Sequence, residues 1–228
     1  MNILVVAAHP DDEILGVGGA IAKHVEAGDK VCALILGEGQ TSRFDRREEA
    51  GAKLLDQLHG DTQRGAAVLG IERVFFENFA DNRFDSVDLL DIVKAVERRI
   101  RDLQPTVVYT HHGGDLNVDH QMTFRAVLTA TRPMAGQPVK ELYTFETVSS
   151  TEWNFEYGDA QFAPNVFMKL TEKQFERKLE AMKQYRTELC AYPHPRSLEM
   201  LRATAVRWGG VAGGRFVEAF EAVRIIKE

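Results

Sequence analysis

A short segment near the amino terminus combines side chains that bind metals with side chains that transfer protons. It reads AHPDDE over residues 8–13 and directly follows an apolar run over residues 3–7 that is typical of a strand. Strands usually end in turn residues such as Gly or Ser. This one delivers an imidazole and three carboxylates into one small volume, which a divalent metal and a hydrolytic water require.

Spacing within this segment separates two roles. If the chain becomes helical here, positions i and i+3 share a face, so His9 and Asp12 converge on one point. Asp11 is rotated off that face and remains close enough to act on a metal-activated water as general base. The alternative is a helix start without chemistry, in which Pro10 takes the first helical position and the acidic side chains complement the helix dipole.

A second segment, residues 111–120, offers the missing ligand. It holds three of the seven histidines and two acidic residues. We expect it to follow the fourth strand, and in the common doubly wound order strands one and four are neighbours whose carboxyl ends border the ligand crevice. His120 is favoured as the ligand because it begins a helix. The alternative for His111 and His112 is a solvated loop, and Asp119 either caps the helix or orients a ligand.

Strand and helix patterns alternate through the first two thirds of the chain. This alternation predicts a Rossmann-like α/β fold, with a mostly parallel sheet and helices on both faces. We expect strands at residues 3–7, 30–36, 73–76 and 105–110, and helices at 14–26, 46–69 (broken near Gly60), 87–103 and 120–130. The last third is less regular and is expected to complete the site, with strands at 141–145, 165–170 and within 216–226 and helices at 172–189 and 198–206.

The glycine-rich run GVGGA at residues 16–20 looks like a dinucleotide-binding fingerprint. Ile21 occupies the place of the third glycine, and the run lies inside the expected first helix instead of in the preceding turn. We interpret these glycines as allowing close packing of the helix on the sheet. The sequence has neither a Walker-type phosphate loop nor a GxSxG nucleophile elbow.

Composition narrows the class of protein. The 228 residues are 44% hydrophobic and 27% charged, which suits one globular domain over residues 1–228. A net charge of −6 argues against a nucleic-acid partner. No apolar run of membrane-spanning length and no signal peptide is visible, so we expect a cytoplasmic protein that is not an integral membrane protein. The sequence is compatible with a homo-oligomer.

Taken together, the two segments resemble the signature of the LmbE-like (PIG-L) zinc deacetylases. The first half is AHPDDE followed by Gly18-Gly19, and the second is DLNVDH at residues 115–120. The resemblance extends over nearly the whole chain and includes DNRFD at 81–85, SSTEW at 149–153 and HPRS at 194–197. It implies Asp11 as general base. It also implies Zn²⁺, with Fe²⁺ or Co²⁺ as alternatives, bound by His9, Asp12 and His120.

The chain departs from the family pattern at two points. Several members carry a histidine where this chain has Asn117, and Asn can donate a hydrogen bond to an oxyanion but cannot supply a proton. His194 is the first candidate for the acid, with a polar loop as its alternative. No basic residue matches the arginine by which some members bind the sugar. Asp81 has a better case as a substrate-binding group, with Arg83 and Arg196 as candidate phosphate contacts.

The resemblance implies hydrolysis of an N-acetyl group from an amino sugar or its glycoconjugate, linked to a nucleotide, a lipid or a small molecule, with release of acetate. One alternative is a zinc amidase that removes a larger acyl group from an amino-sugar conjugate. The other is a non-catalytic small-molecule binding module, which only the Asn117 substitution favours. The size of the pocket beside the metal would separate the two enzymes.

Overall fold

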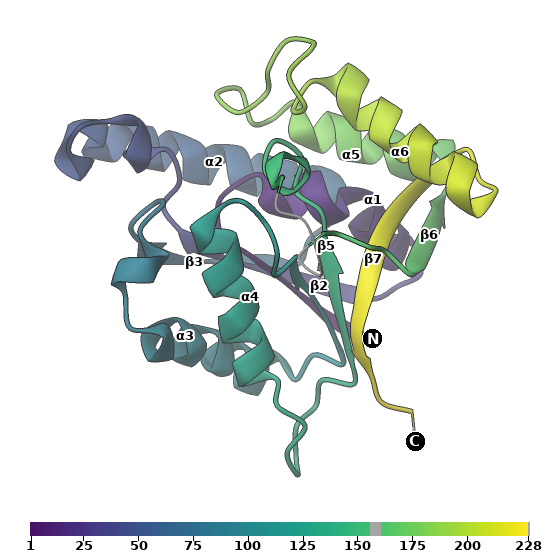
Figure 1. Cartoon of the computed structure of the whole chain (residues 1–228), viewed down its shortest axis with the longest axis horizontal. Coiled ribbons are helices and arrows are strands. Elements are labelled where there is room, and N and C mark those ends of the chain that lie inside the picture. Colours follow the sequence, from purple (N-terminus) through teal and green to yellow (C-terminus); the bar gives the residue numbers. More distant parts are fainter. Residues whose placement is uncertain (156–160, 228) are drawn as a thin grey trace.

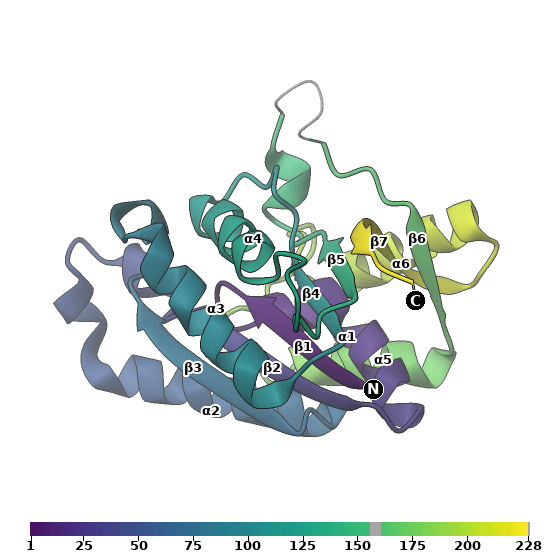
Figure 2. The ribbon, with the colours of Figure 1, turned by 90° about the horizontal axis from the view of Figure 1, so that it is seen from below.

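A seven-stranded sheet forms the centre of the computed structural model, which describes residues 1–155 and 161–227. Its strands are β1 (Asn2–Ala7), β2 (Lys30–Gly37), β3 (Arg73–Phe79), β4 (Val107–His111), β5 (Glu141–Phe145), β6 (Val166–Leu170) and β7 (Phe216–Ile225). They follow the order β3-β2-β1-β4-β5-β7-β6, and all seven are labelled in Figure 2, a view turned by 90° from that of Figure 1. The first five in that order are parallel, and β7 runs antiparallel to both its neighbours.

Helices connect the strands and cover both faces of the sheet. They are α1 (Asp12–Glu26), α2 (Gly51–Leu69), α3 (Leu89–Leu103), α4 (Val118–Ala130), α5 (Glu172–Met182) and α6 (Leu198–Ala212). Short 3₁₀ turns lie at Thr41–Arg43, Arg47–Ala50, Phe84–Ser86 and Thr151–Trp153. Within the described ranges, no helix is both long enough and apolar enough to cross a membrane.

Alternating side chains of the strands build two separate cores. In β1, Ile3 and Val5 belong to the core that α1, α2 and α5 cover, whereas Leu4 and Val6 belong to the core under α3 and α4. Figure 2 shows α3 and α4 on one side of the sheet and α2 and α5 on the other. This period-2 pattern on a sheet covered on both faces is what makes the strand runs almost entirely apolar. The predicted fold class is confirmed.

The expected neighbourhood of the first and fourth strands is also confirmed. β1 pairs with β4 in parallel, with Ile3 opposite Val107. The loop that starts at Ala8 and the loop that follows His111 therefore leave the same edge of the sheet. The strand order changes direction at this point, where open α/β sheets bind their ligands.

Close packing explains the glycines of α1. A Cβ atom at Gly16 would lie 2.1 Å from a ring carbon of Phe145 on β5, and one at Gly19 would lie 2.3 Å from Leu170 on β6. Neither neighbour is the end of a long flexible chain, so a side chain at these positions would displace the helix from the sheet. The packing interpretation of these glycines is confirmed.

Several expected boundaries were wrong. The helix expected over residues 172–189 ends at Met182, because the next residues turn so that the buried Tyr185 hydroxyl can donate to Glu13. The helix expected over 198–206 continues to Ala212, where Gly213 ends it in a left-handed conformation with φ 66°. The break expected near Gly60 does not occur, and α2 is continuous through it.

Candidate active site

The turn from β1 into α1 holds Asp11 in a strained conformation. Its φ is 101°, a value that L-residues rarely adopt and that costs on the order of 1–3 kcal/mol. Asp11 is the N-cap of α1, yet its side chain makes no capping hydrogen bond. Pro10 therefore precedes the helix. The capping alternative, in which Pro10 takes the first helical position, is wrong on this point. The carboxylate of Asp11 is left available for another use.

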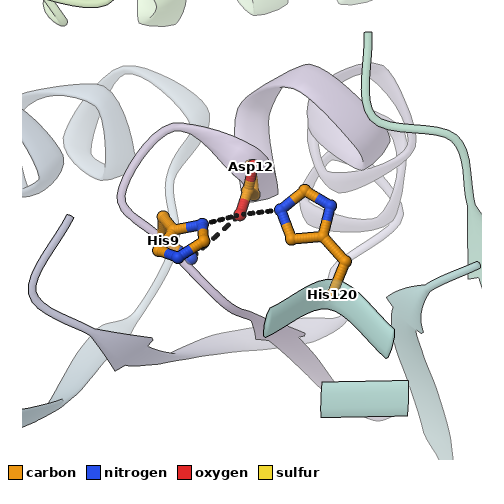
Figure 3. Close-up of side chains that lie close together, drawn as sticks. All are labelled: His9, Asp12 and His120. Atoms are coloured by element: carbon orange, nitrogen blue, oxygen red, sulfur yellow. Dashed lines mark hydrogen bonds and ion pairs between the residues drawn. The ribbon is translucent and has the colours of Figure 1, made fainter. Parts of the chain in front are cut away.

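His9, Asp12 and His120 converge as the spacing argument expected. The Oδ2 atom of Asp12 lies 3.4 Å from Nδ1 of His9 and 3.3 Å from Nε2 of His120. One donor atom from each of the three residues falls within 4.8 Å of the other two. Figure 3 shows both imidazoles turned toward the Asp12 carboxylate, one from the end of β1 and the other from the first turn of α4.

In each of the two imidazoles, the ring nitrogen that does not face Asp12 lies next to another carboxylate. Asp119 accepts from Nε2 of His9 at 2.8 Å, and Asp115 Oδ1 lies 3.1 Å from Nδ1 of His120. The N-cap of α4 is Asn117, whose side chain accepts from the backbone N–H of Asp119. Of the two roles weighed for Asp119, the structure therefore supports orienting an imidazole.

This donor set fits a catalytic zinc site. Two imidazole nitrogens and one carboxylate oxygen are a usual three-residue set, and histidine ligands usually pass their second N–H to a carboxylate. Although burial lowers the pKa of His120, Asp12 and Asp115 raise it to about 9, so the cluster favours a positive charge. A second group consists of His9, Asp81 and Asp119, whose possible ligand atoms also lie within 4.8 Å of one another. Its oxygens already accept hydrogen bonds from Ser42 and from the backbone of the 82–84 turn.

His111 is a buried supporting residue that the sequence did not single out from its loop. Its Nε2 accepts from the backbone N–H of Ala8 at 2.9 Å, and its Nδ1 lies 3.1 Å from the hydroxyl of Thr147. Burial lowers the pKa of His111 to about 4, so the ring is neutral. Its ring stacks on His120 at 3.9 Å between centroids. His111 thereby fixes the approach of β1 to β4 and the plane of the His120 ring.

Asp11, Arg196 and Glu188 form a series of charged side chains linked by hydrogen bonds. The Nη1 atom of Arg196 donates to Asp11 Oδ2 at 3.0 Å and to Glu188 Oε2 at 2.6 Å. Asp11 is only 2% exposed. Burial raises the pKa of its carboxyl well above the usual range, and the opposing effect of Arg196 only partly offsets this.

These residues border a cavity of about 120 Å³ at the carboxyl edge of the sheet. The loops after all five parallel strands contribute to it, and so does the segment between α5 and α6. Six of the predicted site residues line it: His9, Asp11, Asp81, Asn117, His120 and Arg196. Asp12 is buried and is not part of the lining. The other lining residues are Pro10, Gly39, Gln40, Ser42, Arg43, Leu58, Asn82, Ser149, Ser150 and Glu188.

The remaining predicted residues differ in placement. Arg83 is exposed and does not line the cavity. His194 also lies outside the lining, and its Nδ1 accepts from the backbone N–H of Arg196 at 3.1 Å. Asp81 accepts from the hydroxyl of Ser42 at 2.6 Å and lies 3.1 Å from Nε2 of His9. Their roles in binding or proton transfer stay predictions.

Sequence reasoning missed Gln40, Arg43 and Glu188. Glu188 falls in the stretch that the pattern assigned to a helix, where a glutamate suggests only a solvated face. Gln40 and Arg43 follow β2, so their position at the carboxyl end of a central parallel strand was the available signal. Ser149 and Ser150 lay in a segment of the family resemblance but received no role.

The family model for GlcNAc-PI de-N-acetylase (PIG-L) matches residues 4–131, more than half of the chain. The chain belongs to this family. YaiS of Escherichia coli (strain K12), described as an uncharacterized deacetylase, is 28% identical over 191 residues, covering 82% of this chain and 91% of YaiS. A 1D-myo-inositol 2-acetamido-2-deoxy-alpha-D-glucopyranoside deacetylase of Mycobacterium sp. (strain JLS) is 24% identical, covering 92% of this chain and 81% of that protein.

Solved structures share the fold at lower identity. The zinc-inhibited form of teicoplanin deacetylase Orf2 superimposes with a TM-score of 0.79 at 14% identity over the whole of both chains. GalB, the 4-carboxy-2-hydroxymuconate hydratase of Pseudomonas putida KT2440, gives 0.72 at 22% identity, covering 100% of this chain and 98% of GalB. Because a hydratase shares this fold, the fold alone does not define the reaction.

Proposed function

We propose that the protein is a metal-dependent N-deacetylase that releases acetate from an N-acetylated amino sugar or its glycoconjugate. The observation that carries the proposal is the pairing of the His9–Asp12–His120 cluster with Asp11, a carboxylate in the same cavity that does not cap its helix. Family membership and the deacetylases among the relatives support this reaction class. Zn²⁺ is the metal that the donor set favours, with Fe²⁺ or Co²⁺ as alternatives.

The proposed reaction divides the work between the metal cluster and Asp11. When bound to three protein ligands, Zn²⁺ leaves a position for water, lowers the pKa of that water to about 7 and polarises a carbonyl. Asp11 accepts the proton of the attacking water. Its buried, strained position beside the cluster keeps the carboxylate within reach of that proton.

Asn117 and Asp11 complete the cycle in this proposal. One amide hydrogen of Asn117 goes to Asn82 at 3.1 Å, and the other hydrogen is assigned to the oxyanion of the tetrahedral intermediate. The proton on Asp11 then passes to the leaving amine. Asp11 is preferred to His194 for this step because Asp11 lines the cavity and His194 does not. Acetate and a free amino sugar result.

The lining of the cavity favours an acetyl group over a larger acyl group. Pro10 and Leu58 are its apolar side chains within the described part of the chain, and they meet beside Gly39. We assign the acyl methyl group to this corner, since the other lining side chains are polar and would lose hydrogen bonds against it. The sugar hydroxyls would face Asp81 and Asn82, which are polar residues of the same lining.

Acetate release tests the proposal. Wild-type protein is assayed on a panel of N-acetylated sugars, nucleotide sugars and glycoconjugates, before and after chelation and after Zn²⁺ is returned. We expect turnover of at least one substrate, loss with chelator and recovery with metal. His120→Ala should lose both bound metal and turnover, whereas His59→Ala, which alters a ring packed on Phe76, should keep both. Turnover that is indifferent to chelation and to His120→Ala contradicts the proposal.

Two further expectations belong with this proposal. A small-molecule substrate needs no macromolecular partner, and a cytoplasmic location would give access to nucleotide-linked and free amino sugars alike. Association into a homo-oligomer stays a prediction, for which sedimentation equilibrium is the direct measurement.

A further inference from the structure

Arg196 is positioned by hydrogen bonds to its own segment and to the loop after β5. It directly precedes Ser197, which caps α6 by accepting from the backbone N–H of Met200. Its own backbone N–H donates to Nδ1 of His194 at 3.1 Å. Its Nε donates to the hydroxyl of Ser149 at 2.8 Å, in the loop after β5. The guanidinium thus enters the cavity from a rigid helix start with its plane fixed.

Glu188 anchors the same guanidinium from the other side. This carboxylate is 4% exposed. It accepts from Arg196 at 2.6 Å, from Arg43 at 2.8 Å and from the side-chain amide of Gln40. A buried carboxylate with three donors is stable only while those donors remain. Arg43, Glu188, Arg196 and Asp11 therefore form a series of alternating positive and negative side chains. Asp11 is the last member of this series, at the cavity.

The Asp11 carboxylate does not cap α1, although Asp11 directly precedes this helix. An aspartate at an N-cap ordinarily accepts a hydrogen bond from the second or third backbone N–H of its helix. Asp11 makes no such bond, although it is the N-cap of α1. Its Oδ2 instead accepts from Arg196, which comes from a segment 185 residues away. With φ 101°, Asp11 lacks the extended backbone of an ordinary N-cap, and Arg196 is the donor to which its carboxylate is bound.

We infer that Arg196 is a positioning residue, anchored by Glu188 and Ser149, that holds the Asp11 carboxylate in place at the cavity. The inference rests on the proposed function insofar as Asp11 is the base of that reaction. It differs from the sequence expectation that Arg196 contacts a phosphate group of the substrate. In the present arrangement Nη1 is shared between two carboxylates of the protein itself.

Kinetics and metal content of Arg196→Ala test this role. We expect kcat on a neutral N-acetylated sugar to fall by about 10²-fold, the effect of misplacing a reacting group by roughly 1 Å. KM should change less than about threefold and bound metal should stay at the wild-type level, because neither a ligand nor a substrate contact is lost. Added guanidinium ion should restore part of kcat, and ammonium should not. Arg215→Ala removes an exposed arginine paired with Glu172 and is the matched control.

A crystal structure of metal-free Arg196→Ala provides a readout that does not depend on activity. The Asp11 carboxylate should move from its wild-type position, because its Oδ2 loses the donor that holds it. An unchanged carboxylate, a KM increase with kcat intact, or a loss of bound metal would each overturn the inference. If Arg196→Ala does not fold, Glu188→Gln should give the same direction of change, since it releases the anchor at nearly constant volume. Wild-type protein without turnover would count against the proposed function alone, because the crystal structure still decides the orientation of Asp11.

Discussion

At the scale of single residues, two neighbouring aspartates have different surroundings. Asp12 faces the imidazoles of His9, His111 and His120. Burial acts to raise the pKa of its carboxyl, but His120 and His111 outweigh it and hold this pKa well below the usual range. Asp11 faces Arg196 and Glu188, and burial raises its pKa. Adjacent positions in the chain therefore hold one carboxylate suited to a metal and one suited to a proton.

Substitution of Asp11 should separate these two roles. Asp11→Asn keeps the size of the side chain and leaves the three ligands intact, so bound metal should remain near the wild-type level. Turnover should fall by about 10²–10⁴-fold, the usual contribution of a positioned general base. Acetate-release kinetics and elemental analysis on the same sample provide the measurement. If metal and turnover disappear together, the division of roles is wrong.

Asp119 should influence the metal without contacting it. Asp119→Asn weakens the acceptor for Nε2 of His9, so metal affinity should fall by roughly 10–100-fold. Competition with a chelating dye measures this affinity. Asp88→Asn is the control, because Asp88 is exposed and makes no capping hydrogen bond at the start of α3. Equal affinities in the two variants would show that Asp119 does not orient the ligand.

At the scale of elements, the contact between α1 and β5 determines where the first ligands lie. Gly16→Ala places a methyl group against Phe145, and such overpacking should destabilise the protein by about 1–3 kcal/mol. Gly210→Ala, in α6 with no neighbour within 4 Å, should instead stabilise the protein by about 0.5–1 kcal/mol. Urea unfolding of both variants tests the pair. Similar shifts in the two would contradict close packing at Gly16.

Leu58 on α2 forms the apolar corner of the cavity together with Pro10. Leu58→Ala should enlarge that corner, so the ratio of kcat/KM for propionyl to acetyl substrates should increase. The free energy of unfolding should fall by about 2–5 kcal/mol, as for other buried leucines. Leu69→Ala alters a fully buried leucine at the far end of α2 and should cost similar stability while leaving the acyl preference unchanged. The same acyl preference in both variants would argue against the assigned corner.

At the scale of the whole molecule, the His9–Asp12–His120 cluster joins segments that are distant in sequence. His9 and Asp12 follow β1, and His120 starts α4 more than 100 residues later. A ligand that binds only the folded chain stabilises it by about 2.7 kcal/mol at 100 times its dissociation constant. Zn²⁺ should therefore raise the melting temperature of the wild type, and His120→Ala should abolish the shift. Differential scanning fluorimetry measures both, and an equal shift in the two proteins would place the metal elsewhere.

Much of the fold was predictable because its determinants are local and repeat along the chain. Apolar runs of strand length, each followed by an amphipathic helix, define a parallel sheet whatever the details of packing. The end of α5 was not predictable in this way. Residues 183–189 continue a helical pattern, but Tyr185 leaves it to donate to Glu13 on α1. Glu188 leaves it to accept from Arg196, which lies beyond the end of the pattern.

The sequence by itself predicted that His9, Asp12 and His120 converge, because His9 and Asp12 lie within one turn of each other and His120 follows the strand that the topology places beside β1. It also determined Asp11 as the carboxylate next to them. Only the tertiary structure decided how Asp11 is used. Its partner Arg196 lies 185 residues away, and the contact of the Asp11 carboxylate depends on which donor the packed chain brings to it. Local spacing carries no information about that donor, whereas packing does.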